Sequence, residues 1–258
     1  MTNPTFHKPF HSSSGVSTGR ILQTTFSVAF LLATLFTGFS PRMFSSNFGE
    51  IISGILTPQP EDGAAVSTAQ KIVRIGIVSG HWGNGGDPGA VCPDGKNELD
   101  VNLAITSLVR QKLEARSYNI DLLQEFDSRL DGYQAALLLS IHSDTCDVID
   151  DQATGFKVAV SAYSRDNNLT DRLSACLYDR YGSTTGLQYR SGNVTDNMTD
   201  YHAFRAIDPS TPAAIIEIGF LNLDRTLLMD HPEVVADGLV AGILCFVKSE
   251  SALPIPTP

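Results

Sequence analysis

The chain has 258 residues, with 28 acidic and 18 basic side chains and a formal net charge of −10 at pH 7. Residues 1–70 are balanced in charge, so the negative charge falls entirely on residues 71–258. An acidic surface without a basic stripe repels phosphate backbones, and we therefore expect no nucleic-acid binding.

The first feature along the chain is an uncharged segment, residues 21–41, centred on FSVAFLLATLF. At 1.5 Å per residue it is long enough to cross a hydrocarbon core of about 30 Å. Lys8 and Arg20 precede it, which predicts a cytoplasmic leader (residues 1–20) and export of the chain beyond residue 41. We expect a single membrane anchor with the folded part outside the cytoplasm. The alternatives are a cleaved signal peptide, which would leave a secreted protein, and a buried soluble helix.

The rest of the chain divides by composition. Residues 42–70 are rich in Pro, Ser, Gly, Thr and Gln without a sustained period, which predicts a flexible linker. Residues 71–250 form the expected globular domain. The tail, residues 251–258, contains three prolines and is predicted to be disordered.

Short apolar runs alternate with helix-period segments from residue 71 onward. Asn97 is a candidate N-cap for the clearest helix, and Gly182 is placed to end a later one. The expected strands are residues 72–78, 118–123, 135–141, 155–162 and 213–218, and the expected helices are residues 97–115, 169–181 and 232–247. This order predicts a single three-layer α/β domain, with a mixed, largely parallel sheet of about five or six strands flanked by helices.

Four residues that can carry chemistry fall near one edge of that sheet. His81 follows the first strand, His142 follows the third, and Glu217 lies near the end of the last. Glu98 lies in the first turn of the helix after a glycine-rich loop. Because open α/β sheets bind ligands beyond the carboxyl ends of their strands, we expect the four to converge.

Two imidazoles and a carboxylate are a ligand set that holds a catalytic zinc, and a further carboxylate is needed to move the proton of water. The four residues fill this list and predict a zinc hydrolase. Each also has an ordinary reading: a structural histidine, an acid at a helix N-terminus, or a buried paired acid. The spacings of 17 and 44 residues match no local metal motif, so both readings stay open on the residues alone.

The ordered series SGHWGNGGDPGAV, GKNELDVNLAI, LLLSIHSD, GFKVAV and PAAIIEIGFLN resembles the zinc-dependent N-acetylmuramoyl-L-alanine amidases of the type 3 family, from about residue 72 to 247. The resemblance implies His81, Glu98 and His142 as ligands of Zn²⁺ and Glu217 as the catalytic acid/base. It also implies hydrolysis of the amide between N-acetylmuramic acid and L-alanine in bacterial cell-wall peptidoglycan. Two alternatives remain: a zinc peptidase that cuts within the stem peptide, and a non-catalytic wall-binding module.

The chain departs from the family pattern at several points. Val78 and Ser79 stand where the family has Asp-Pro, Leu123 and Gln124 replace Thr-Arg, and Asp144 replaces an Asn. None of these changes removes a ligand or the acid/base. Many relatives carry an inserted helix after the second histidine that plugs the site. Here only about a dozen residues, 145–155, intervene, so we expect an open site.

Four cysteines, all in the expected exported part, leave three pairings open. Cys92 and Cys146 both lie near the expected metal site, and we predict a disulfide between them, with two free thiols as the alternative. Cys176 and Cys245 lie on apolar helix faces and are expected to be unpaired core residues. We expect His202 to be a surface histidine rather than a substrate contact, and Trp82 either to stack on a sugar or to pack under the glycine loop. Nothing identifies a protein activator, so the expected partners are peptidoglycan and, through residues 21–41, the membrane.

Overall fold

The computed structural model describes residues 73–256. The leader, the anchor or signal segment and the linker predicted above all lie outside the described residues. Among residues 73–256, no helix is both long and apolar enough to cross a lipid bilayer.

The domain is built on one five-stranded sheet with the order β2-β1-β3-β5-β4. Four of the strands run parallel, and β4 pairs antiparallel with β5 at one edge. The strands are β1 (Arg74–Ser79), β2 (Asn119–Leu123), β3 (Leu138–Asp144), β4 (Lys157–Val160) and β5 (Ala213–Phe220). The predicted mixed, largely parallel sheet is therefore confirmed, with five strands.

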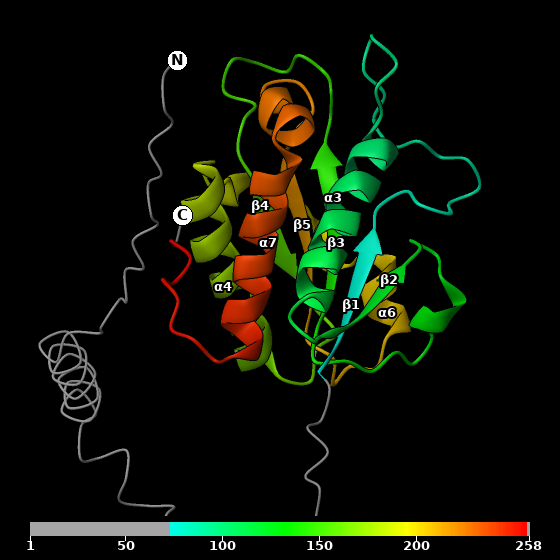
Figure 1. The fold of residues 1–258 in the computed structure, drawn as a ribbon, viewed down its shortest axis with the longest axis vertical. Helices are drawn as coiled ribbons and strands as arrows, with labels where there is room; N and C mark the ends of the chain where they lie inside the picture. The colour runs from blue at the N-terminus through cyan, green and yellow to red at the C-terminus, as the bar shows by residue number, and fades with distance from the viewer. Residues whose placement is uncertain (1–72, 257–258) are drawn as a thin grey trace, which may run out of the picture. The chain divides into compact units, whose positions relative to one another are not determined.

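Helices cover both faces of the sheet (Figure 1). The long helices α3 (Glu98–Glu114), α4 (Asn167–Thr185) and α7 (Pro232–Val247) pack on one face. The opposite face carries η2 (Ser128–Leu130), α5 (Asp196–Thr199) and α6 (His202–Ala206). Two short turns of helix, η3 (Ser191–Asn193) and η4 (Thr226–Asp230), complete the described elements. The arrangement confirms the expected three-layer α/β domain.

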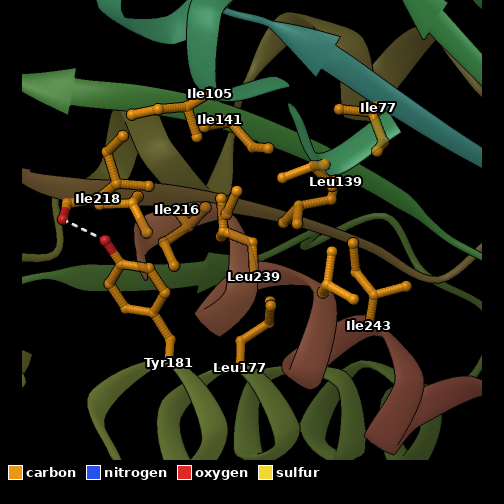
Figure 2. Packing of buried hydrophobic residues seen from close by; sticks show 14 of the residues in the cluster. Ile77, Ile105, Leu139, Ile141, Leu177, Tyr181, Ile216, Ile218, Leu239 and Ile243 are labelled. Atoms are coloured by element: carbon orange, nitrogen blue, oxygen red, sulfur yellow. Dashed lines mark hydrogen bonds between the residues drawn. The ribbon is translucent and has the colours of Figure 1, made fainter. Parts of the chain in front are cut away.

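The larger core lies between the sheet and α3, α4 and α7 (Figure 2). Ile77, Leu139 and Ile216 project from three neighbouring strands and are fully buried. Tyr181 of α4 is also buried, and its hydroxyl donates to the backbone carbonyl of Ile218 over 2.6 Å. Fully burying an isoleucine or leucine side chain contributes about 1.5–3 kcal/mol. Burial of these side chains therefore stabilises the strands whose ends carry the site.

The helix boundaries follow local signals, with one exception. Asn97 caps α3 as predicted, because its side chain accepts from the amide of Asp100. The prediction that Gly182 ends α4 is wrong: the helix continues to Thr185 and ends at Gly186, which adopts a left-handed φ of 75°. A Cβ on Gly182 would lie 3.3 Å from the Phe156 ring, so this glycine allows close packing inside the helix.

Both pairs of cysteines are joined. The predicted Cys92–Cys146 disulfide is present and links the glycine-rich loop to the segment after β3. The expectation that Cys176 and Cys245 are unpaired is wrong, since they form a second disulfide between α4 and α7. Packing of these two helices brings the α carbons to 5.7 Å, a separation suited to the bond.

The described part of the tail, residues 251–256, has no regular structure. It lies against α4 nevertheless, because the carbonyl of Ser251 accepts from Arg180 over 2.8 Å and the amide of Leu253 donates to Asp179 over 3.3 Å.

Candidate metal centre and active site

The structure brings three of the predicted residues together at the carboxyl ends of the parallel strands. His81 follows β1, His142 lies near the end of β3, and Glu98 opens α3. Each offers a ligand atom, and these atoms all lie within 4.8 Å of one another. The loop of residues 80–97 that joins β1 to α3 leaves the sheet at this end (Figure 1).

Glu98 is the centre of the cluster and is only 5 % exposed. Its Oε2 lies 3.1 Å from Nε2 of His81, and its Oε1 lies 3.2 Å from Nδ1 of His142. The carboxylate also accepts from the side-chain amide of Asn102 and from the backbone amides of Ala90 and Ser143. Five partners hold both oxygens in place, so the orientation of the Glu98 carboxylate is fixed by the fold.

His81 has a left-handed backbone, with φ of 63°. This conformation is uncommon for a residue other than glycine and persists where the surroundings enforce it. The Glu125 Oε2 accepts the His81 amide over 2.8 Å. The ring is held from its other side, since Nδ1 lies 3.1 Å from Oδ2 of Asp87. His81 therefore presents Nε2 to the cluster.

Two glycines allow the loop to approach the ligand side chains. A Cβ on Gly80 would lie 2.4–2.6 Å from three ring atoms of His142. A Cβ on Gly89, which has φ of 66°, would lie 2.6 Å from Oε2 of Glu98. Neither contact leaves room for a side chain, so both positions require glycine while the cluster keeps this geometry.

Glu217 lies beside the cluster without joining it. It is the register partner of His142 across the parallel pair β3–β5, so both side chains leave the sheet on the same face. The Glu217 side chain is half-buried, and its Oε2 is buried without a hydrogen-bond partner in the structure. Burial raises the pKa of the Glu217 carboxyl to about 7. An unpaired oxygen of this kind is available to a proton of water or substrate.

The opposite neighbour of Glu217 is Lys157, its register partner on the antiparallel strand β4. The Lys157 ammonium is largely buried and is paired with the carboxylate of Asp144. Asp144 stands where the family pattern has an asparagine. Its carboxylate, unlike an amide, balances the charge of the buried Lys157 ammonium. The positive charge of Lys157 acts to lower the pKa of Glu217, opposing burial.

The charges within the cluster reinforce one another. The hydrogen bond to Glu98 raises the pKa of His81 to about 9. Burial acts to lower the pKa of His142, but its interactions with Glu98 and Glu217 leave that pKa raised. Burial acts to raise the pKa of Glu98, but the two histidines outweigh it and hold this pKa below its usual range. Without a metal ion, the ionised carboxylate of Glu98 therefore favours the protonated forms of His81 and His142.

The donor set fits a metal ion. Two imidazoles and one carboxylate converge, both histidines are oriented by other contacts, and an acid without a partner lies next to them. Two imidazoles and one carboxylate are a donor set that holds zinc in catalytic sites, where one position is left for water or substrate. The connection from β3 to β4, residues 145–156, contains no helix, as its length predicted.

Sequence reasoning missed two further buried residues at this edge. Glu125 lies two residues after the end of β2 and is 6 % exposed, and Tyr201 precedes α6 and is also buried. The Tyr201 hydroxyl donates to Glu125 over 3.2 Å and lies 3.4 Å from Nε2 of His142. Position offered a signal for Glu125, because it lies at a strand's carboxyl end like the other candidates.

The remaining candidates lie around this group. His202 is half-buried, bonds the carbonyl of Glu125 over 2.8 Å and stacks on the ring of Phe126 at a centroid distance of 4.0 Å. His202, expected to be a surface histidine, is therefore packed beside Glu125 and only partly exposed. Trp82 is half-buried, and its carbonyl accepts the Glu125 amide over 2.9 Å.

Comparison with known proteins gives this fold and site a class. The family model described as N-acetylmuramoyl-L-alanine amidase (Amidase_3) matches residues 75–244. No curated protein matches the chain. The chain belongs to the type 3 N-acetylmuramoyl-L-alanine amidase family, and its enzymatic class is that of a peptidoglycan amidase.

Solved structures have the same fold at low sequence identity. The CwlD amidase of Clostridioides difficile, determined in complex with the GerS lipoprotein, is 22 % identical with a TM-score of 0.55, over 69 % of this chain and 100 % of its own. The amidase Ami1 of Mycobacterium smegmatis is 16 % identical with a TM-score of 0.54, over 69 % and 98 %. An N-acetylmuramoyl-L-alanine amidase of Clostridium difficile 630 is 21 % identical with a TM-score of 0.54, over 70 % and 99 %.

Proposed function

We propose that the protein is a zinc-dependent amidase that cleaves the bond between the lactyl group of N-acetylmuramic acid and L-alanine in peptidoglycan. The observation that carries this proposal is the convergence of His81, Glu98 and His142 around one point, with Glu217 beside them on the same face of the sheet. We assign the metal to Nε2 of His81, the carboxylate of Glu98 and Nδ1 of His142, the atoms that face one another.

The reaction uses the protein residues in distinct roles. Zinc, when bound, supplies a Lewis acid that polarises a carbonyl and makes water acidic near neutral pH. Glu217 accepts the proton that water loses as its oxygen bonds to the lactyl carbonyl carbon. Glu217 then delivers this proton to the L-alanine nitrogen as the carbon–nitrogen bond breaks. The products are a free muramic acid carboxyl and a stem peptide with a free amino group.

The raised pKa of Glu217 suits this double role. A carboxyl with a pKa near neutrality takes up and releases a proton more readily than one with an ordinary pKa. Lys157 flanks Glu217 in the sheet and supplies positive charge that favours the ionised form of Glu217. The unpaired Oε2 gives the water proton a place to go.

Zinc dependence is tested by removing and restoring the metal. The full-length protein, stripped with a chelator, is expected to lose solubilisation of purified peptidoglycan and to recover it with stoichiometric zinc. Magnesium is the control, because it prefers oxygen ligands in octahedral geometry and does not suit this donor set. Full activity in the metal-free protein would contradict the proposal.

We propose further that the catalytic domain works outside the cytoplasm, anchored through residues 21–41 or secreted after cleavage. Two disulfides within the domain support this location, since such bonds persist in oxidising compartments. Cell fractionation tests it: the domain should be accessible to protease added outside intact cells with permeable walls. Protection equal to that of a cytoplasmic marker would contradict the proposal.

A further inference from the structure

We propose that Glu125 and Tyr201 are positioning residues that hold the two histidines of the metal centre in their ligating states. Glu125 fixes the backbone of His81, and Tyr201 fixes the proton of His142 on Nε2, which leaves Nδ1 free as the ligand atom. The inference rests on the proposed metal site and extends it to two residues outside the ligand set.

The first step is the direction of the hydrogen bonds on Glu125. Its Oε2 accepts the His81 amide over 2.8 Å, and a backbone amide can only donate. Its Oε1 accepts the Tyr201 hydroxyl over 3.2 Å. A carboxylate provides acceptors only, so the Tyr201 proton points at Glu125.

The second step follows from the geometry of the phenol. Because its single proton is directed to Glu125, the Tyr201 oxygen can only accept from its other neighbours. These are the hydroxyl of Ser140, which donates over 3.3 Å, and Nε2 of His142 at 3.4 Å. His142 must therefore carry a proton on Nε2. A neutral imidazole then has its lone pair on Nδ1, the nitrogen that faces Glu98.

The third step concerns His81. Its left-handed backbone costs free energy, and a conformation of this kind persists only when contacts enforce it. The bond from its amide to the buried Glu125 is such a contact. One carboxylate thus acts on both histidines: directly on the backbone of His81 and through Tyr201 on the ring of His142.

The Glu125→Gln variant should reverse the direction of the hydrogen bond between residue 125 and Tyr201. The glutamine oxygen must face the His81 amide, which directs its NH₂ group to Tyr201. The phenol then accepts from glutamine and turns its proton toward Nε2 of His142. This favours the proton on Nδ1 and blocks the ligand atom. Removing the hydroxyl as well, in Glu125→Gln/Tyr201→Phe, removes the misdirected proton.

The test measures zinc affinity by competition with a chromogenic chelator in the full-length protein and its variants. Tyr201→Phe should weaken zinc binding by about 10–100-fold, the usual effect of losing a partner of a ligating histidine. Glu125→Gln should weaken it more, and the double variant should return to the affinity of Tyr201→Phe. Tyr189→Phe is the control, since that hydroxyl bonds the Val158 carbonyl at the similar length of 3.3 Å, away from the cluster. Its affinity should match the wild type.

Nitrogen-15 NMR of the zinc-loaded proteins gives a second readout, the positions of zinc and hydrogen on the His142 ring. Loss of fold stability alone would not change these positions. The wild type should show His142 with zinc on Nδ1 and hydrogen on Nε2, assigned by comparison with His142→Asn. The inference would be overturned if the loss of zinc affinity in the double variant equalled the product of the losses in the two single variants. Zinc on Nε2 of His142 would also overturn it. A wild type that binds zinc in this way but leaves peptidoglycan intact would contradict the proposed function alone. A wild type that binds no zinc would overturn both.

Discussion

Glu217 and His142 are register partners on the neighbouring parallel strands β5 and β3, and both side chains leave the sheet on the same face. Neighbouring strands lie about 4.8 Å apart, so Glu217 stands one strand away from the cluster of His81, Glu98 and His142. This spacing places a proton acceptor beside the cluster without making it a ligand. The separation of the two roles can be tested by substitution.

Glu217→Gln keeps the size of the side chain and removes the acid/base. We expect kcat on peptidoglycan to fall by about 10²–10⁴-fold, the contribution typical of such a group, while bound zinc stays at the wild-type level. Turnover and metal content are measured on the same preparation. Glu233→Gln, at an exposed position in the first turn of α7, is the matched control and should change neither value. Wild-type kcat in Glu217→Gln would remove the assigned role.

The pH dependence of zinc binding follows from the cluster. In the metal-free protein the pKa of His81 is raised from 6.5 to about 9, so its ring is protonated at pH 7. Zinc binding must displace that proton, and the affinity should rise with pH until about pH 9. Calorimetry at pH 7 in buffers of different ionisation enthalpy should show release of at least one proton. A binding heat that is independent of the buffer would contradict this expectation.

The raised pKa of His81 also predicts how the stability of the metal-free protein depends on pH. Because the folded-state pKa of His81 is raised, its pairing with Glu98 stabilises the fold fully below about pH 6.5. That stabilisation is lost as the pH rises through about 9. Denaturant titrations of wild type and His81→Asn at pH 6 and pH 10 measure it: the difference in unfolding free energy should shrink at the higher pH. An equal or larger difference at pH 10 would show that the pairing does not stabilise the fold.

Close packing of the glycine loop gives a fourth prediction. Gly80→Ala adds a methyl group 2.4 Å from Cε1 of His142, which must move the ring. We expect zinc affinity to fall by about 10–100-fold, as when a ligating histidine loses its orientation. Gly192→Ala is the control, because a Cβ there meets nothing within 4 Å. Unchanged affinity in Gly80→Ala would mean that the ring position is not required.

The two disulfides allow a matched comparison. They join residues 54 and 69 positions apart, so removing either should cost a similar amount of stability, about 2–5 kcal/mol. Only Cys92–Cys146 joins the glycine loop to the segment after His142. The Cys92→Ser/Cys146→Ser variant should therefore bind zinc more weakly than Cys176→Ser/Cys245→Ser, measured well below both melting temperatures. Equal affinities would show that this bond only stabilises the fold.

Local signals predicted most of the fold. The α7 helix has the bounds expected from Pro232 and its apolar period, and α3 begins beside the expected cap. Gly182 misled the prediction because the same residue type serves helix ends and close packing, and only the position of Phe156 distinguishes the two uses. The Cys176–Cys245 bond depends on how α4 packs on α7, which helical period does not encode.

The site divides in the same way. Three of the four predicted residues meet and Glu217 lies beside them, because each lies at a strand end or helix start, positions that the sequence reveals. Glu125 also lies at a strand end, but no ligand set required a further acid. Tyr201 comes from a segment 59 residues after His142, and its contact with Nε2 depends on how the chain before α6 packs on the sheet. Contacts of this kind follow from tertiary packing and have no local sequence signal.

The most direct measurement is the identity of the fragments that the full-length, zinc-loaded protein releases from purified peptidoglycan. Mass spectrometry should find free stem peptides that begin with an unblocked L-alanine, together with glycan strands whose muramic acid carboxyls are free. Fragments cut within the stem, with L-alanine still attached to muramic acid, would contradict the amidase account and indicate a peptidase.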